Sequence, residues 1–273
     1  MSAVPLPEGW STRLRVTQSR VILSEWTKFR SIRSTRWSMF VAFILTIGFS
    51  CIAATVTVIR WSHMSPLEQA SRNPLNIAII GAEFSQLAVG ILGVLVITGE
   101  YSTGMIRASL GAVPKRLPFL WAKLIVFATV TFVLMVPAVL AAFFGSQAIL
   151  RSDDILKLSF SDPGVARAVL GVALYVTGVG VLTLAIGAMI RNTAGGIAIF
   201  VAIFFVIPPL LLILPLSWYQ PISEYLPSSV GGDVYAIHHG PHDLGPWSGF
   251  GVFCAYIAAA IVAAAGMLVR RDA

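Results

Sequence analysis

Charged side chains are rare in this 273-residue chain, so those that interrupt apolar sequence are the first candidates for chemistry. The densest group lies in GEYSTGMIRASLGAVPKRLPFLWAK, residues 99–123, which contains one acid, Glu100, and four bases. A single carboxylate, Glu83, stands inside an apolar run, and histidines cluster in HHGPHD, residues 238–243. The first feature suggests a loop that binds a partner, and the second a buried polar site. The third has the residue types of a metal site.

The histidine cluster does not fit a known catalytic spacing. The pattern of His238, His239, His242 and Asp243 matches no hydrolase signature, and the chain contains no HExxH. A solvated loop is therefore the favoured interpretation, and we predict no metal site. The chain also lacks paired aspartates in its apolar runs, a nucleophile elbow and the P-loop pattern GxxxxGK[ST]. We predict that it is not an enzyme and binds no cofactor, and that any ATPase serving it is a different chain.

The composition is that of a membrane protein. Hydrophobic residues make up 57% of the chain, charged residues 11%, and the mean hydropathy is +0.84. A soluble globular protein carries about twice that share of charge. Crossing a bilayer core of about 30 Å as a helix takes about 20 apolar residues, and the long unbroken apolar runs favour helices over the alternating strands of a barrel. We predict an all-α polytopic membrane protein.

Six apolar runs are long enough to be transmembrane helices. Their expected limits are Trp37–Ile59, Ile77–Thr98, Phe119–Ile149, Val165–Ile190, Thr193–Leu216 and Pro246–Val269. The third run is over-long, so we expect its true edges a few residues inside these limits. Only Arg191 and Asn192 separate the fourth and fifth runs, which predicts a tight turn at one membrane face.

The distribution of bases predicts the orientation. Fourteen of the 19 Lys and Arg residues fall on the side of the two termini and five on the other, which places both termini in the cytoplasm. The predicted organisation is a cytoplasmic lead-in (1–36), a six-span domain (37–269) and a cytoplasmic tail (270–273), with a cytoplasmic loop (99–118) and an outer loop (217–245). Topology explains the basic charge, and no nucleic-acid-binding module accompanies it, so we expect no nucleic acid partner.

The lead-in contains an amphipathic segment, VILSEWTKFRSIRSTR, residues 21–36. On a helical wheel its apolar side holds Ile22, Trp26, Phe29 and Ile32, and its opposite side Ser24, Thr27, Lys28 and Ser31. We predict an N-terminal interfacial helix along the inner leaflet. The alternative is a solvated basic segment that only fixes topology.

Two further regions leave alternatives open. Glu83, Gln86, Gly90 and Gly93 recur at helical spacing and form one polar and small stripe on the second span. That stripe either lines a passage or forms a helix–helix seam with a satisfied acid. The outer loop contains prolines and aromatic residues, which suit either short helices dipping into the membrane or an aromatic belt.

The loop at residues 99–123 resembles the cytoplasmic loop of bacterial ABC-2 type permeases, the membrane subunits of ATP-binding-cassette exporters. The matching pattern is E-Y-x-x-G, then [IV]-R, then P-x-R and a lysine entering the next span. It is supplied here by Glu100, Tyr101, Gly104, Ile106, Arg107, Pro114, Arg116 and Lys123, with Met105 where threonine is commoner. The segment SEWTKFRSIRSTRW, residues 24–37, is similar to the lead-in helix of the same family.

The resemblance implies a partner and a set of roles. Two permease subunits, identical or related, would pair around a pathway in the bacterial plasma membrane and sit on separate ATPase subunits that bind ATP-Mg. Glu100, Tyr101, Gly104 and Arg107 would belong to the ATPase-coupling loop, with Glu100 placed to cap or pair with Arg107. Glu25, Trp26, Lys28 and Phe29 would belong to the connecting helix beside it.

In this family the second and fifth spans tend to line the pathway. That makes Phe204 of the fifth span a lining candidate together with the stripe on the second span. Phe200, Phe204 and Phe205 hint at a hydrophobic or amphipathic cargo, and the family implies export. The competing reading is a membrane scaffold or immunity protein that sequesters a ligand without an ATPase. An ion-coupled secondary transporter is disfavoured, because Glu83 is the one carboxylate placed well inside a span.

Overall fold

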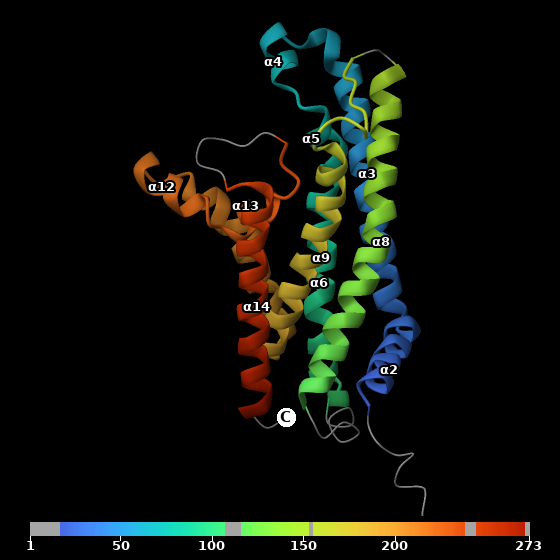
Figure 1. Ribbon diagram of the computed structural model, residues 1–273, viewed down its shortest axis with the longest axis vertical. Coiled ribbons are helices and arrows are strands. Elements are labelled where there is room, and N and C mark those ends of the chain that lie inside the picture. The colour runs from blue at the N-terminus through green and yellow to red at the C-terminus, as the bar shows by residue number, and fades with distance from the viewer. Residues whose placement is uncertain (1–16, 107–115, 153–154, 238–243, 271–273) are drawn as a thin grey trace, which may run out of the picture.

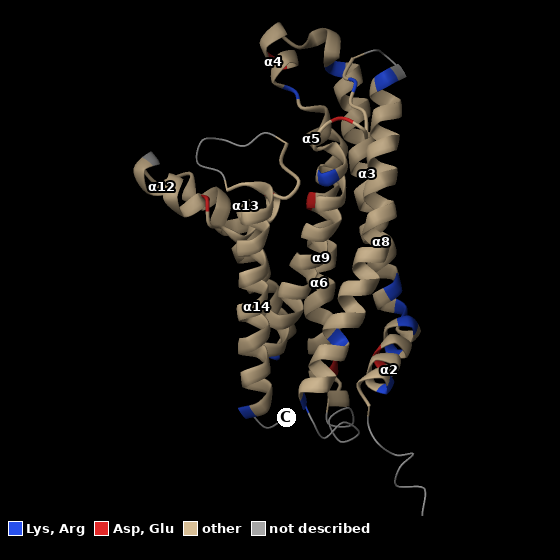
Figure 2. Ribbon diagram, viewed as in Figure 1, with Lys and Arg blue, Asp and Glu red and all other residues tan. Residues whose placement is uncertain are grey.

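The computed structural model describes residues 17–106, 116–152, 155–237 and 244–270, and these residues form helices joined by turns, with no strand among them. Six helical stretches are long and apolar enough to cross a membrane, which confirms the predicted fold class at that level. The charged residues gather toward the two ends of these helices and leave most of their middle apolar (Figure 2). The protein is therefore a multi-pass membrane protein.

The elements follow one another in simple order. They are α2 (Gln18–Ser31), α3 (Arg33–Arg60), a short 3₁₀ turn (Trp61–His63), α4 (Pro66–Ser71), α5 (Pro74–Ile79), α6 (Gly81–Ser102), α8 (Arg116–Ser152), α9 (Val165–Ile190), α10 (Thr193–Val201), a π-helical segment (Ala202–Val206), α11 (Ile207–Leu211), α12 (Leu216–Ser223), α13 (Pro227–Gly232) and α14 (Pro246–Arg270).

Helix α9 is the centre of the bundle. It is apolar around its whole circumference, as a helix surrounded by other helices should be, and 72% of its most apolar stretch is buried. It packs against α6, α8, α10 and α14, while α3 packs against α6 and α8. Only 17% of the most apolar stretch is buried in the fifth span (Thr193–Leu211) and in α14, so these two spans present most of their apolar surface to lipid or to another chain.

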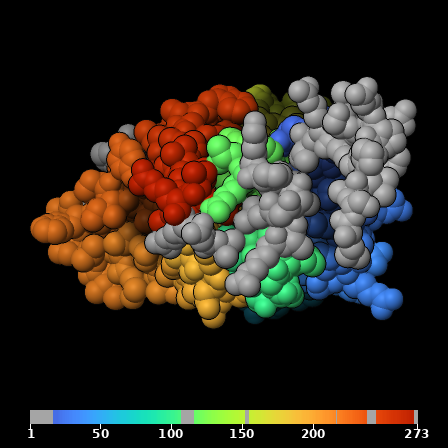
Figure 3. All heavy atoms as spheres, turned by 90° about the horizontal axis from the view of Figure 1, so that it is seen from below, coloured from blue at the N-terminus to red at the C-terminus, as the bar shows by residue number. Residues whose placement is uncertain are grey.

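Helix α2 and the C-terminal end of α14 lie at the same end of the molecule, called here the lower end as in Figure 1. Helix α4 lies at the opposite, upper end. Seen from below (Figure 3), α10 and α14 occupy one side and α2 the other, with the ends of α6 and α8 between them. An even number of spans brings α2 and the C-terminal end of α14 to one face of the molecule, and the cytoplasmic location of that face remains a prediction.

Several helix limits differ from the predicted ones. The third span is a single helix that extends beyond the expected edges, to Arg116 and Ser152, so the expectation of a shorter helix is wrong. The fifth ends at Leu211 and not at Leu216, and a turn then leads to Pro215, which cannot continue a helix from the preceding residues. The second span is interrupted at Ile80, and the backbone N–H of Gly81 donates to Ser50 Oγ of α3 at 3.2 Å.

The amphipathic segment at residues 21–36 is not one helix. Helix α2 ends at Ser31, Ile32 is extended (φ −78°, ψ 113°), and Arg33 begins the first spanning helix. Lys28, predicted on the solvated side of α2, is half-buried. Trp26 is 45% exposed, as a side chain that meets lipid would be, and an interfacial position of α2 remains a prediction.

The predicted outer loop contains two short helices, α12 and α13. Both lie below the upper ends of α3 and α8 in Figure 1, and α12 extends away from the bundle. The hydroxyl of Tyr256 in α14 donates to the carbonyl of Tyr225 at 2.9 Å, which ties the loop to the last span. Partial entry of this loop into the membrane remains a prediction.

Candidate functional site

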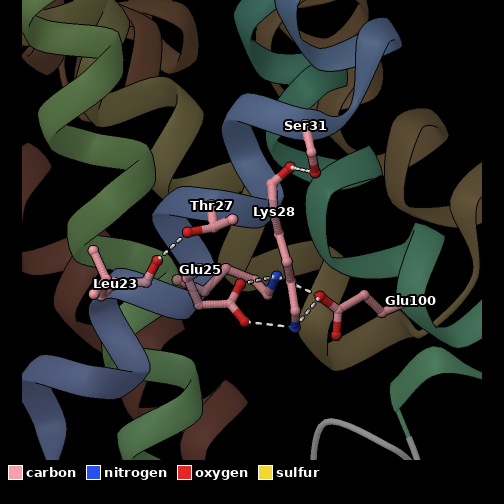
Figure 4. A network of polar contacts seen from close by, with 7 residues as sticks. Leu23, Glu25, Thr27, Lys28, Ser31 and Glu100 are labelled. Carbon is pink, nitrogen blue, oxygen red and sulfur yellow. Dashed lines mark hydrogen bonds and ion pairs between the residues drawn. The ribbon is translucent and has the colours of Figure 1, made fainter.

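Four charged side chains from α2, α6 and α8 meet at the lower end of the molecule. Figure 4 shows three of them, Glu25, Lys28 and Glu100, pointing toward one another. Lys123 Nζ in α8 lies 2.7 Å from Glu25 Oε2 in α2 and 2.8 Å from Glu100 Oε1 in α6. Lys28 Nζ in α2 lies 2.7 Å from Glu25 Oε1 and 3.3 Å from the same Glu100 oxygen. We call these four residues the charged bridge, because they join α2, α6 and α8.

The bridge forms because one face of α2 packs on the bundle. Val21, Glu25 and Phe29 follow one another at intervals of four residues, so they share that face and are buried. The ring of Phe29 meets Phe127 of α8 edge-on, with centroids 6.3 Å apart. Glu25 is thus carried between two apolar anchors into contact with Lys123.

The bridge is electrically balanced and mostly dry. The side chains of Glu25, Glu100 and Lys123 are about 5% exposed, whereas that of Lys28 is 28% exposed. The ring of Phe119 lies 5.2 Å from Lys123 Nζ and 5.6 Å from Lys28 Nζ, close enough for cation–π attraction. Two carboxylates facing two ammonium groups avoid an uncompensated buried charge, which is the costly case.

The ionisation of Lys28 reflects these contacts. Burial lowers the pKa of Lys28, but the hydrogen bond and charge of Glu25, followed by those of Glu100, outweigh it and raise this pKa above its ordinary value. Lys28 is therefore an ammonium at neutral pH, although it is half-buried.

Glu100 lies in the last turn of α6, directly before a sharp helix stop. Gly104 has φ +69°, the left-handed conformation that glycine adopts without steric cost, and its N–H donates to the carbonyl of Tyr101 at 3.2 Å. The backbone is helical again at Met105 and Ile106. Arg107 and Pro114 of the family pattern lie outside the described residues. So does the predicted pairing of Glu100 with Arg107.

The same turn of α6 also contacts the connection between α9 and α10. The guanidinium of Arg191 lies 5.2 Å from the centre of the Tyr101 ring. One turn earlier, the hydroxyls of Thr98 and Thr193 are 2.9 Å apart. The predicted tight turn exists, with Arg191 itself in a left-handed conformation (φ 58°) and the side chain of Asn192 accepting the N–H of Gly195. The end of α6 is therefore linked to two separate parts of the bundle.

A pocket of about 410 Å³ opens beside the charged bridge, between α2, α3, α6 and α8. Its polar end is formed by the bridge residues and by Ser34, Thr35 and Ser38. Its apolar wall includes Leu92, Leu95 and Val96. The bridge is thus the end wall of a cavity at the junction of α2 and α3, and a change in the angle of α2 would alter both.

The predicted stripe on α6 splits into two environments. A side-chain carbon on Gly90 would strike the ring of Phe200 in α10, and one on Gly93 would strike α9 at Gly180 and Thr183, so both glycines form close helix contacts. Gln86 is buried and Glu83 is exposed. Phe204 is buried, with its ring centre 5.5 Å from that of Phe200. The seam alternative therefore describes the two glycines, while Glu83 lies apart.

Sequence reasoning named most of the bridge but not its centre. Glu25, Lys28 and Glu100 were site candidates, whereas Lys123 appeared only as part of a family pattern. The signal was available: Lys123 is the one charged residue between Phe119 and Ile149, and a base inside a span needs an acidic partner. His238, His239, His242 and Asp243 lie outside the described residues. That they bind no metal therefore remains a prediction.

Comparison with known proteins adds no relative. No family model matches the chain, and no curated protein is similar to it. The function of the chain is therefore inferred from its own residues and from their positions in the structure.

Proposed function

We propose that this chain is the membrane-spanning permease subunit of an ATP-binding-cassette exporter and catalyses no reaction itself. The observation that carries the proposal is the charged bridge. It joins the lead-in helix α2 and the start of α8 to the last turn of α6, next to the Gly104 stop. The residues resembling the ABC-2 permease loop and lead-in helix are those that meet there.

In this proposal the lower end is cytoplasmic and receives a separate ATPase. The excess of bases on the side of the termini supports that orientation. A force on the segment after Gly104 would reach α6 through Glu100 and Tyr101, and from there α2, α8 and the turn between α9 and α10. Such a connected set of rigid helices suits the transmission of nucleotide-driven closure into a tilt of the spans.

A second permease subunit completes the proposed pathway. The weakly buried apolar surfaces of α10 and α14 leave room for a helix-to-helix contact with another copy or a related chain. The cargo in this proposal is hydrophobic or amphipathic, as the apolar fifth span suggests. Phe200 and Phe204 are buried, and Phe205 is the half-buried phenylalanine of this group.

The test is reconstitution in liposomes with an ATP-binding-cassette ATPase from the same cell. We expect the two to co-purify, and we expect Glu100→Ala and Arg107→Ala to reduce ATP-driven transport at least about tenfold. Glu68→Gln is the matched control, since this exposed carboxylate at the upper end caps α4 far along the chain from the bridge. Normal assembly and transport by both alanine variants would refute the coupling role.

The scaffold alternative predicts a different result in the same preparation. A chain that only sequesters a ligand would leave the membrane alone on gentle solubilisation. Isolation without any ATP-binding subunit, from the cells that naturally produce this chain, would therefore contradict the proposed function.

A further inference from the structure

A second cavity lies toward the upper end, away from the charged bridge. It has a volume of about 240 Å³ and lies between the start of α6, the upper part of α9 and the segment that follows α13. Its polar lining consists of Asn76, Glu83, Tyr175 and Tyr235. Glu83 is the carboxylate that the sequence places inside the second span, and its largely exposed side chain lies at the wall of this cleft.

The polar groups of the cleft lack protein partners. Within the described part of the chain, the Glu83 carboxylate has no hydrogen bond or ion pair, and the hydroxyls of Tyr175 and Tyr235 have no hydrogen bond. Tyr175 is only 4% exposed as a residue, and it lines the cavity. An ionisable group at membrane depth that lines a cavity together with other unpaired polar groups indicates a binding function.

The base on the same side of α9 does not neutralise Glu83. Arg167 donates instead to two backbone carbonyls, those of Val234 at 2.7 Å and Ala236 at 2.9 Å. These bonds hold the segment that carries Tyr235 against α9. Burial, and after it the charges of Glu83 and Asp233, raise the pKa of Tyr235, so its hydroxyl keeps its proton and remains a dipole.

The aromatic rings are fixed in place. Tyr175 and Tyr235 meet edge-on, with centroids 5.5 Å apart and planes at 63°, and Phe253 of α14 lies 5.6 Å from Tyr175. Electron-rich tyrosine faces attract cations, and most strongly where water is scarce. A carboxylate beside two such rings is the donor set expected for an organic ammonium group.

Other ligand classes fit less well. An anion would be repelled by Glu83, since Arg167 is engaged with carbonyls. A metal ion would need more ligands, and no group of three or more His, Cys, Asp or Glu residues occurs in the described ranges. We infer that the cleft binds a small organic cation, with its ammonium group against Glu83 and its alkyl groups against the rings of Tyr175 and Tyr235.

The role of the cleft as a cargo site rests on the proposed function. It adds to that proposal that the exporter would select amphipathic molecules by their positive charge. The binding itself needs no ATPase. Choline is a suitable probe, because 3,3-dimethylbutan-1-ol is its neutral isostere and differs only in the central atom.

The experiment measures choline binding to the purified chain in lipid nanodiscs by equilibrium dialysis. We expect saturable binding, at least about tenfold weakening in Glu83→Gln, and a smaller loss in Tyr235→Leu, which removes a ring but no charge. Glu68→Gln, which removes a carboxylate at the same end, should bind as the wild type does. Thermal melting of each variant in the same nanodiscs shows whether it is folded.

Three results would overturn the inference: no choline binding up to millimolar concentration, equal binding by folded Glu83→Gln, or competition by the neutral isostere as strong as that by unlabelled choline. A variant that fails to fold is replaced by Glu83→Asp, which keeps the charge but shortens the side chain, and which should weaken binding without abolishing it. Unchanged binding by Glu83→Asp in that case also counts against the site. Choline binding by a chain that associates with no ATPase would refute the exporter and leave the site standing.

Discussion

At the scale of single residues, Lys123 determines how three helices meet. Its ammonium group is shared between Glu25 of α2 and Glu100 of α6, at 2.7 and 2.8 Å. Sequence reasoning found the acids through a family pattern, but it could not assign Lys123 as their partner. Pairing over 98 residues along the chain depends on the rotation of α2 about its axis, and the helical wheel of an isolated segment does not contain that information.

Replacing Lys123 with methionine should destabilise the fold more than replacing Lys28. The first change leaves two buried carboxylates with only the partly exposed Lys28, and loss of one partner of a buried ion pair costs about 3–5 kcal/mol. Lys28→Met removes a charge that is 28% exposed and leaves Lys123 in place, so its cost should be smaller. Thermal unfolding in detergent measures both, and equal losses would contradict the central place of Lys123.

Alkaline pH should weaken the bridge through Lys28. Its folded-state pKa is raised above 10.5, so its contribution is fully present below that value and is lost as pH rises through the raised pKa. Between pH 8 and pH 12, the melting temperature of the wild type should therefore fall further than that of Lys28→Met. Parallel curves for the two proteins would show that this lysine does not stabilise the fold.

At the scale of elements, apolar length predicted the six spans but not their ends. The runs of apolar residues identify each spanning helix, because burial in lipid demands them. The end at Leu211 and the break at Ile80 depend instead on prolines and on a contact with α3, which hydropathy does not report. Hydropathy also does not predict the different environments along the stripe on α6. Gly90 and Glu83 fit the same helical spacing, but Gly90 packs against Phe200 and Glu83 is exposed.

The contact between α6 and α10 should be sensitive to a single methyl group. Gly90→Ala places that group against the ring of Phe200, and overpacking of this kind costs about 1–3 kcal/mol. Phe200→Leu should recover part of that loss when combined with it, so the two changes should not be additive in thermal unfolding.

Gly48→Ala is the control for this experiment. It adds the same methyl group in the middle of α3, where nothing lies within 4 Å. We expect it to leave stability unchanged or slightly improved, because alanine favours a helix over glycine. Equal destabilisation by the two substitutions would mean that the effect comes from glycine itself and not from the seam.

At the scale of the whole molecule, polar contacts at the lower end connect all six spans. The charged bridge joins α2, α6 and α8, and α2 leads directly into α3. Arg191, between α9 and α10, lies against Tyr101 of α6 and donates to Met267 of α14, while Arg116 at the start of α8 donates to Leu268.

The orientation of the bundle can be tested with single cysteines. Cys51 and Cys254 are free thiols, so a background with both changed to alanine permits labelling at chosen sites. We expect Ser71→Cys, at the exposed end of α4, to react with a membrane-impermeant maleimide in intact cells. Ser19→Cys, exposed on α2, should react only after permeabilisation. The reverse pattern would invert the proposed topology and remove the coupling argument.

The length of α8 has a mechanical consequence. Its 37 residues extend about 56 Å, well beyond a bilayer core of about 30 Å, and the helix bends along its course in Figure 1. Pro137 stands near its middle and removes one backbone hydrogen bond, which allows a kink there. The part below Pro137 is then a lever arm of about 30 Å, so a swing of about 10° at the proline would displace the lower end by about 5 Å while the upper half stayed still.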